Sequence, residues 1–160
     1  MIVAAGKGEQ QCARLLFRHG QALLESGRLP EARRLFKEAI LLDRKYADAY
    51  EAHAFAAARE RAQGIFGKLN DNISSLLSGD ERIVVAFLSK AAPEIGMKAG
   101  SWEACFGAAM FYVNLHLVKI GAMDYDYTAK AWLEKADKAC AGRKAERLMK
   151  SENEELRGKI

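Results

Sequence analysis

Between Leu16 and Ala39 the chain repeats small and large apolar residues at the intervals expected of two short helices. Successive members lie 4, 3, 4, 2, 3, 4 and 3 positions apart: Leu16, Gly20, Leu23, Gly27, Leu29, Ala32, Phe36 and Ala39. Intervals of three and four residues place side chains on one face of an α-helix. Ser26-Gly27 interrupts the first stripe, and Pro30 suits the first turn of a second helix. The spacing therefore predicts two antiparallel helices joined by a tight turn.

The small residues have a mechanical role in this interpretation. Gly20 and Ala32 are expected where the two helices approach most closely, because a larger side chain would separate them. Gly27 is expected to form the turn, since glycine accepts backbone angles that other residues avoid. The whole pattern resembles the tetratricopeptide repeat (TPR), a helix–turn–helix unit of about 34 residues.

The resemblance extends over residues 12–63 and weakens after them. It comprises one full repeat and the first helix of a second, which is expected to run from about residue 47 to 63 and to end at Gly64. A fainter echo at 129–136 resembles the second helix of a repeat. Because repeat units bury a core only by stacking on their neighbours, at least three helix pairs are expected.

The rest of the chain also shows helical rather than strand patterns. Over 64–100 we expect inserted irregular helices, and over 101–141 a long helix with a partner helix. Capping residues, glycines and prolines set the expected boundaries. Helices are expected over 68–77, over 101–120 with Ser101 as cap, and over 128–141. A further helix should begin at the capping-box spacing of residues 78–81 and end before Pro93, with a loop over 94–100 and a turn over 124–127. Residues 142–160 are either a capping helix or a frayed tail.

These elements predict an all-α fold in which antiparallel helix pairs stack as a short, right-handed TPR-like superhelix with inserted irregular helices. A length of 160 residues suits one domain. We therefore expect residues 1–160 to form a single helical domain. The cysteine count of 3 is odd, which argues against a disulfide-stapled scaffold.

The resemblance implies where a partner would bind. Members of the family bind ligands on the concave surface lined by the first helix of each pair, which here would carry Arg14, Phe17, Gln21, Leu24, Glu25, Asp48, Glu51, Phe55 and Arg59. Aromatic and arginine side chains contribute most of the binding energy at interfaces. The function expected is therefore a scaffold or adaptor that binds another protein or a peptide. A chaperone-tail adaptor is disfavoured, because Phe17 and Ala52 stand where such members carry a Lys/Asn clamp.

Catalytic and metal-binding motifs do not stand out in this sequence. The histidines, His19, His53 and His116, lack neighbours at ligand spacing, and we expect them to be partly buried between helices. The cysteines, Cys12, Cys105 and Cys140, are expected to behave as buried small apolar residues. We therefore predict no catalytic residue, metal or cofactor, and no enzymatic activity.

The net charge is +4, and basic residues cluster in one place, around the second helix. They are Arg28, Arg33, Arg34, Lys37, Arg44 and Lys45. Acidic residues are interleaved with these cations, so a solvated helix face is favoured over a nucleic-acid-binding stripe. Nucleic-acid binding through this helix is the weakest of three hypotheses, and steep salt dependence would support it.

The most apolar segment, 104–120, is interrupted by Asn114, His116 and Lys119, which opposes a membrane-spanning helix. The first residues lack the basic and apolar regions of a secretory signal, so a cytoplasmic location is the default expectation. Self-association into a homo-oligomer is left open.

A second hypothesis, from another functional class, concerns the long helix over 101–120. A pocket around it would make the chain a ligand-holding or transport-accessory protein, with Trp102, Phe106, Asn114 and His116 as candidate lining. An open pocket with convergent Asn114 and His116 would favour this function, whereas a closed apolar core would exclude it.

Overall fold

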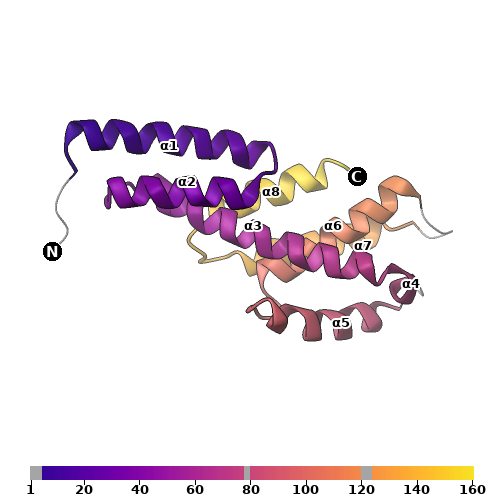
Figure 1. The fold of residues 1–160 in the computed structure, drawn as a ribbon. Coiled ribbons are helices and arrows are strands. Elements are labelled where there is room, and N and C mark those ends of the chain that lie inside the picture. The colour runs from indigo at the N-terminus through magenta and orange to yellow at the C-terminus, as the bar shows by residue number, and fades with distance from the viewer. Residues whose placement is uncertain (1–4, 78–79, 120–123) are drawn as a thin grey trace. The chain divides into compact units, whose positions relative to one another are not determined.

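A computed structural model describes residues 5–77, 80–119 and 124–160. Its helices are α1 (Lys7–Glu25), α2 (Leu29–Leu42), α3 (Ala47–Asp71), α4 (Ile73–Leu76), α5 (Glu81–Glu94), α6 (Trp102–Val118), α7 (Asp126–Ala139) and α8 (Glu146–Arg157) (Figure 1). The described residues contain no strand, which confirms the all-α class. The chain divides into two compact units, Met1–Glu60 and Arg61–Ile160, called unit 1 and unit 2 below.

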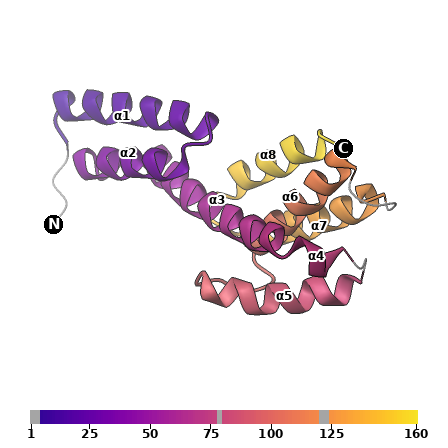
Figure 2. The same cartoon turned by 45° about the vertical axis from the view of Figure 1, so that its right-hand side comes forward.

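Unit 1 begins with α1 and α2, which lie side by side and antiparallel (Figure 1 and Figure 2). Gly27 connects them with a φ of +81°, a value that residues with a Cβ rarely adopt. The turn is closed by a hydrogen bond of 2.9 Å from the Arg28 N–H to the Leu23 carbonyl. Pro30 lies at the start of α2, so the predicted helix–turn–helix is confirmed.

The close approach predicted at Gly20 is also confirmed. A Cβ atom added to Gly20 would lie 2.6 Å from Cε1 of Phe36, so only glycine fits against this ring. Phe36 and Ala32 are fully buried on α2, and Ala52 and Ala56 of α3 complete the same cluster. Small residues thus let three helices of unit 1 pack around one phenylalanine.

A second cluster in unit 1 joins the far ends of the same helices. Its buried members are Ala13, Ala39 and Ala49, one from each of α1, α2 and α3. The Phe17 ring links the two clusters, because its centroid lies 5.6 Å from that of Phe36 and 5.2 Å from that of Tyr46. Phe17 is therefore part of the packing of unit 1.

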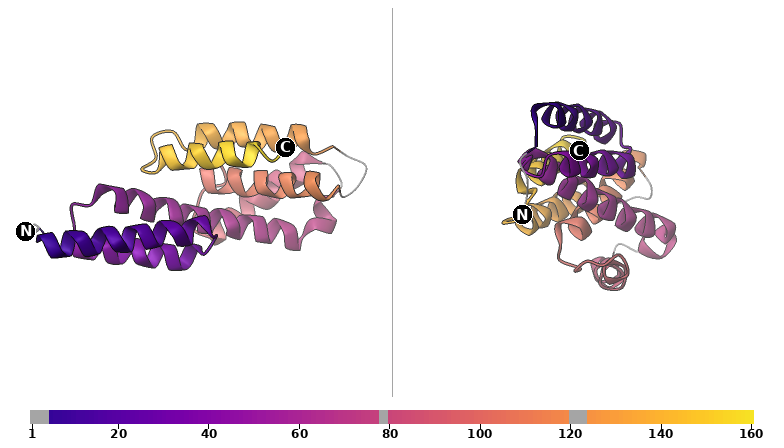
Figure 3. Two further views of the ribbon diagram at one scale, coloured as in Figure 1. Left: turned by 90° about the horizontal axis from the view of Figure 1, so that it is seen from above. Right: turned by 60° about the vertical axis from the view of Figure 1, so that its left-hand side comes forward.

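Unit 2 is built around α6, which is apolar on all sides and buried along most of its length. Ser101 caps it as predicted, since its hydroxyl accepts the Ala104 N–H at 3.3 Å. α7 lies along α6, and α8 contacts both of them (Figure 3). On α8 the buried residues are Met149, Asn153 and Leu156. Of the two alternatives for residues 142–160, the structure has the capping helix.

Two predicted helix ends are wrong. α3 continues through Gly64 to Asp71, because the flanking Ile65 and Leu69 are fully buried and their burial outweighs the helix cost of glycine, about 1 kcal/mol. The predicted helix over 68–77 is instead the end of α3 followed by the short α4. α5 continues past Pro93 to Glu94, because in the last turn the ring removes only one helical hydrogen bond.

Smaller differences concern the other helix boundaries. Ser78 and Gly79 of the predicted capping box lie outside the described residues, and the cap of α5 is Asp80, whose side chain accepts the Arg82 N–H. α6 ends at Val118 rather than near residue 120, and α7 begins at Asp126 rather than at 128. Cap geometry, which sequence patterns locate only to within a residue or two, accounts for these shifts.

Candidate functional site

Two predicted partner-binding residues, Arg14 and Asp48, line the same surface pocket of unit 1. The pocket has a volume of about 240 Å³ and is lined by Arg14, Asp43, Lys45, Tyr46, Ala47 and Asp48. Arg14 comes from α1, and the other residues come from the α2–α3 connection and the start of α3. Arg14 and Asp48 are 34 positions apart, the length of one tetratricopeptide unit.

The α2–α3 connection holds the rim of this pocket in place. The Asp43 carboxylate accepts the backbone N–H of Lys45 at 3.1 Å, and the Tyr46 ring packs on Phe17. Partial burial is the main reason why the pKa of Tyr46 is raised, so its hydroxyl stays protonated at neutral pH. The pocket thus presents two cations, two carboxylates and a tyrosine, which are groups for polar contacts with a partner.

The remaining predicted partner-binding residues lie on α1 and α3 with different exposure. Gln21 and Glu25 are exposed, and Glu51 and Arg59 are half-buried. Phe17 is half-buried in the packing described above, and Phe55 is only 5% exposed. The aromatic part of the expected groove therefore belongs to the interior. Helical periodicity alone does not tell a groove-facing phenylalanine from a core one.

Three of the four residues named for the alternative pocket, Trp102, Phe106 and His116, lie at two separate places on α6. Trp102 and Phe106 are almost completely buried, with stacked rings whose centroids lie 4.7 Å apart. At the other end of the helix, His116 Nδ1 lies 3.2 Å from Asp124 Oδ1. The backbone N–H of Asp126 is the main cause of the lowered pKa of Asp124. The aromatic pair is in a closed core, and His116 pairs at the protein surface.

The histidines and cysteines of the described residues differ in exposure and do not form a common metal site. His19 is exposed, contrary to expectation, whereas His53 and His116 are half-buried as expected. Cys12 is exposed, so the expectation of three buried thiols is wrong there, while Cys105 and Cys140 are buried. No three potential metal ligands cluster among residues 5–77, 80–119 and 124–160.

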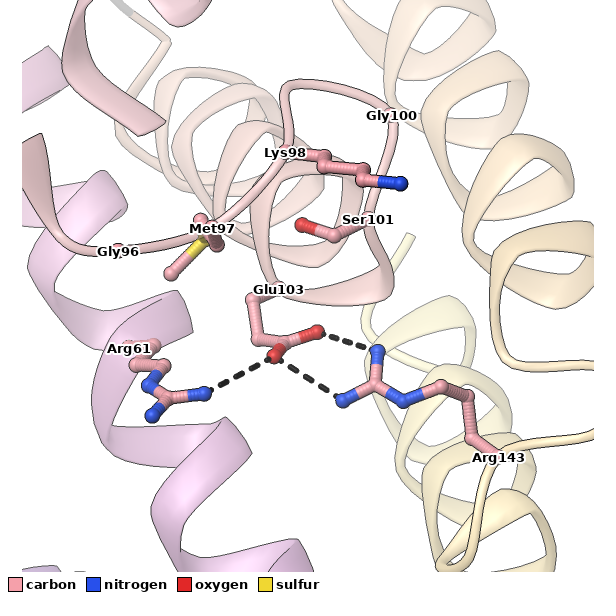
Figure 4. Close-up of a pocket in the computed structure, with 8 residues that line it drawn as sticks. All are labelled: Arg61, Gly96, Met97, Lys98, Gly100, Ser101, Glu103 and Arg143. Atoms are coloured by element: carbon pink, nitrogen blue, oxygen red, sulfur yellow. Dashed lines mark hydrogen bonds and ion pairs between the residues drawn. The ribbon is translucent and has the colours of Figure 1, made fainter. Parts of the chain in front are cut away.

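A larger pocket, which sequence reasoning missed, lies within unit 2 (Figure 4). Its volume is about 500 Å³, and its lining is Arg61, Gly96, Met97, Lys98, Gly100, Ser101, Glu103 and Arg143. The side chains come from α3, from the α5–α6 loop, from the first turn of α6 and from the α7–α8 turn. We call it the Glu103 pocket.

Glu103 is the structural centre of this pocket. It is a carboxylate with 2% exposure in a mostly apolar helix, and Arg143 donates two hydrogen bonds to it, at 2.8 and 3.1 Å. These bonds are the main cause of the raised pKa of Arg143. Arg61 approaches from the other side, with Nη1 3.9 Å from Glu103 Oε2 (Figure 4). One buried acid thus lies between two guanidinium groups, hydrogen-bonded to that of Arg143 and ion-paired at longer distance with that of Arg61.

The signal for this pocket was present in the sequence but ambiguous. Glu103 is the only carboxylate between Ser101 and Lys119, yet an acidic residue in a first helical turn is usually read as a partner of the helix dipole. Arg61 and Arg143 lie about 40 positions away on either side, and no local spacing links them to it.

Comparison with protein-family models, with curated proteins and with solved structures found no match. Within the described part of the chain, no helix has both the length and the apolar character needed to cross a bilayer.

Proposed function

We propose that this protein is a small helical scaffold that binds another protein or a peptide through unit 1, in the manner of a tetratricopeptide module. The observation that carries the proposal is the shared pocket of Arg14 and Asp48. Residues one repeat length apart, one on α1 and one on α3, line a single surface site. This is the arrangement by which repeat proteins build a continuous binding surface.

The chemistry of the pocket favours polar recognition. Arg14 and Asp48 are exposed and carry opposite charges, and the volume of about 240 Å³ is suited to a side chain rather than to a whole ligand. A peptide segment would place a polar or charged side chain there while its neighbours contact Gln21 and Glu25 along α1. Charged contacts of this kind contribute to specificity and to association rate.

The experiment compares affinity capture from extract of the native cells by two versions of the full chain. Arg14→Ala combined with Asp48→Ala should abolish capture of proteins retained by the wild type. These exposed residues are chosen because replacing Phe17 or Phe55 would disturb the core. Circular dichroism should show an unchanged helix content.

The matched control is Arg34→Ala combined with Glu38→Ala, a pair of exposed charges on α2 outside the pocket. This control should capture the same proteins as the wild type. Equal retention by the Arg14/Asp48 variant, or equal loss in both variants, would reject the assignment of the binding surface.

A further inference from the structure

We propose that the Glu103 pocket binds a small organic anion through carboxylate or phosphate groups. The site lies entirely within unit 2 and is independent of the surface proposed for partner binding. Its lining contains three cationic side chains, Arg61, Lys98 and Arg143, and one carboxylate, Glu103. The charges of the lining therefore do not balance, and the excess is positive.

Glu103 and Arg143 compensate each other. A buried carboxylate is costly unless a cation pairs with it and donates hydrogen bonds, and Arg143 meets both conditions. This pair accounts for one negative and one positive charge of the lining. The two remaining cations, Arg61 and Lys98, are those available to a ligand.

In the part of the chain that the structure describes, neither remaining cation donates a hydrogen bond to the protein from its charged group, and Arg61 makes only a long ion pair with Glu103. The 3.9 Å between Arg61 Nη1 and Glu103 Oε2 exceeds hydrogen-bond distance, and the Arg61 side chain is 50% exposed. Lys98 is exposed, and its ammonium group forms no hydrogen bond or ion pair within the described residues. Guanidinium and ammonium groups whose N–H donors are not used by the protein are groups that bind carboxylate and phosphate oxygens.

The size of the pocket indicates an organic anion rather than a bare ion. A volume of about 500 Å³ lies within the usual range for small-molecule sites, roughly 300–1,000 Å³. Met97 lines the wall near Arg61 and offers an apolar contact to a carbon skeleton (Figure 4). Cationic groups and a thioether in one pocket suit a small molecule with an anionic group and an apolar part.

The test is isothermal titration of the full chain at low ionic strength with two probes, citrate for carboxylates and glycerol 2-phosphate for phosphates. We expect at least one probe to bind saturably, with one molecule per chain. The probe with the higher affinity identifies the preferred anionic group. Added salt should weaken the binding, because the contacts are charged and solvent-accessible.

Two substitutions in the pocket and one outside it test whether the probe binds at the Glu103 pocket. Arg61→Gln and Lys98→Gln keep side-chain length but remove charge, and each should weaken the stronger probe by about tenfold, the loss expected for one charge-assisted hydrogen bond. Arg82→Gln on α5 removes an exposed cation outside the pocket and should leave affinity unchanged. Glu103 and Arg143 are kept, since each holds the other in place.

Three results would overturn the proposal: no saturable binding of either probe at millimolar concentrations, unchanged affinity in both Arg61→Gln and Lys98→Gln, or an equal loss in Arg82→Gln. The Arg14→Ala/Asp48→Ala chain should bind the anion like the wild type. A failure of the partner-binding proposal is therefore distinguishable from a failure of this one.

Discussion

Gly107 of α6 lies directly against Ile65 of α3, with no room for a methyl group between the two helices. A Cβ atom added to Gly107 would be 2.6 Å from Ile65 Cγ2 and 2.8 Å from the Ala62 carbonyl oxygen. A backbone carbonyl cannot rotate away as the end of a flexible side chain can. This contact therefore sets the separation of the α3 and α6 segments in unit 2.

Replacing Gly107 by alanine should destabilise the protein. The gain in helix propensity, about 0.5–1 kcal/mol, is smaller than the roughly 1–3 kcal/mol cost of overpacking a dense core. Urea denaturation should show a net loss on the order of 1 kcal/mol or more. Gly67→Ala is the control, because a Cβ there meets nothing within 4 Å, and it should be neutral or stabilising. Equal stability of the two variants would contradict the close contact.

Replacing Glu103 by glutamine should also destabilise the protein. The change leaves Arg143 without its carboxylate and removes one of two charges that the fold has paired. Breaking a fully buried pair costs about 3–5 kcal/mol. Since the Arg143 side chain is 38% exposed, we expect less here, about 2 kcal/mol in the free energy of unfolding. Glu134→Gln is a matched control on exposed α7 surface, and its effect should stay within about 0.5 kcal/mol.

Replacing Asn153 by leucine should disrupt a buried polar network. The Asn153 amide oxygen accepts the Trp102 indole N–H at 2.9 Å, and its NH₂ group donates to Asp137 at 2.9 Å. Leucine would remove the acceptor to which the buried indole N–H donates, at a cost of about 1–3 kcal/mol. Thermal unfolding should detect the loss, and Glu155→Ala on the exposed face of α8 should not share it. An unchanged melting temperature in the leucine variant would argue against the network.

The three cysteines should differ sharply in reactivity. Cys12 is exposed, whereas burial raises the pKa of the Cys105 thiol to about 11 and also raises that of Cys140. Thiolate is the reactive form, so a buried thiol with a raised pKa reacts slowly at neutral pH. A disulfide exchange reagent should titrate one thiol rapidly in the native protein and the other two only after urea is added. Cys12→Ser should remove the fast phase alone.

Local sequence signals were sufficient to predict the first helix pair. Gly27 and Pro30 mark the turn with backbone requirements that few other residues meet, and Gly20 marks the close approach. The end of α3 could not be predicted in this way. Gly64 is a stop signal locally, and the burial of Ile65, a tertiary effect, overrides it.

The candidate sites likewise differ in whether local sequence signals predict them. The common surface location of Arg14 and Asp48 could be predicted because a repeat period relates them, and their role in partner binding stays a prediction. Phe55 was misjudged, since periodicity assigns a helix face but not what covers it. The Glu103 pocket joins residues about 40 positions apart without any period, so only the folded arrangement brings them together.

The hydrogen bond between Trp102 and Asn153 also has a consequence for how α8 docks. A shift of α8 by one helical turn would bring Glu152 to the buried position of Leu156, or Asn153 to that of Met149, so the apolar contacts already disfavour it. Such a shift moves Met149 or Arg157 into the place of Asn153. Arginine offers no acceptor and methionine only a weak one, so the indole N–H would lose its partner in either shifted state. The Asn153 amide thus adds a polar requirement to the apolar one, and both are met only in the observed register of the last helix.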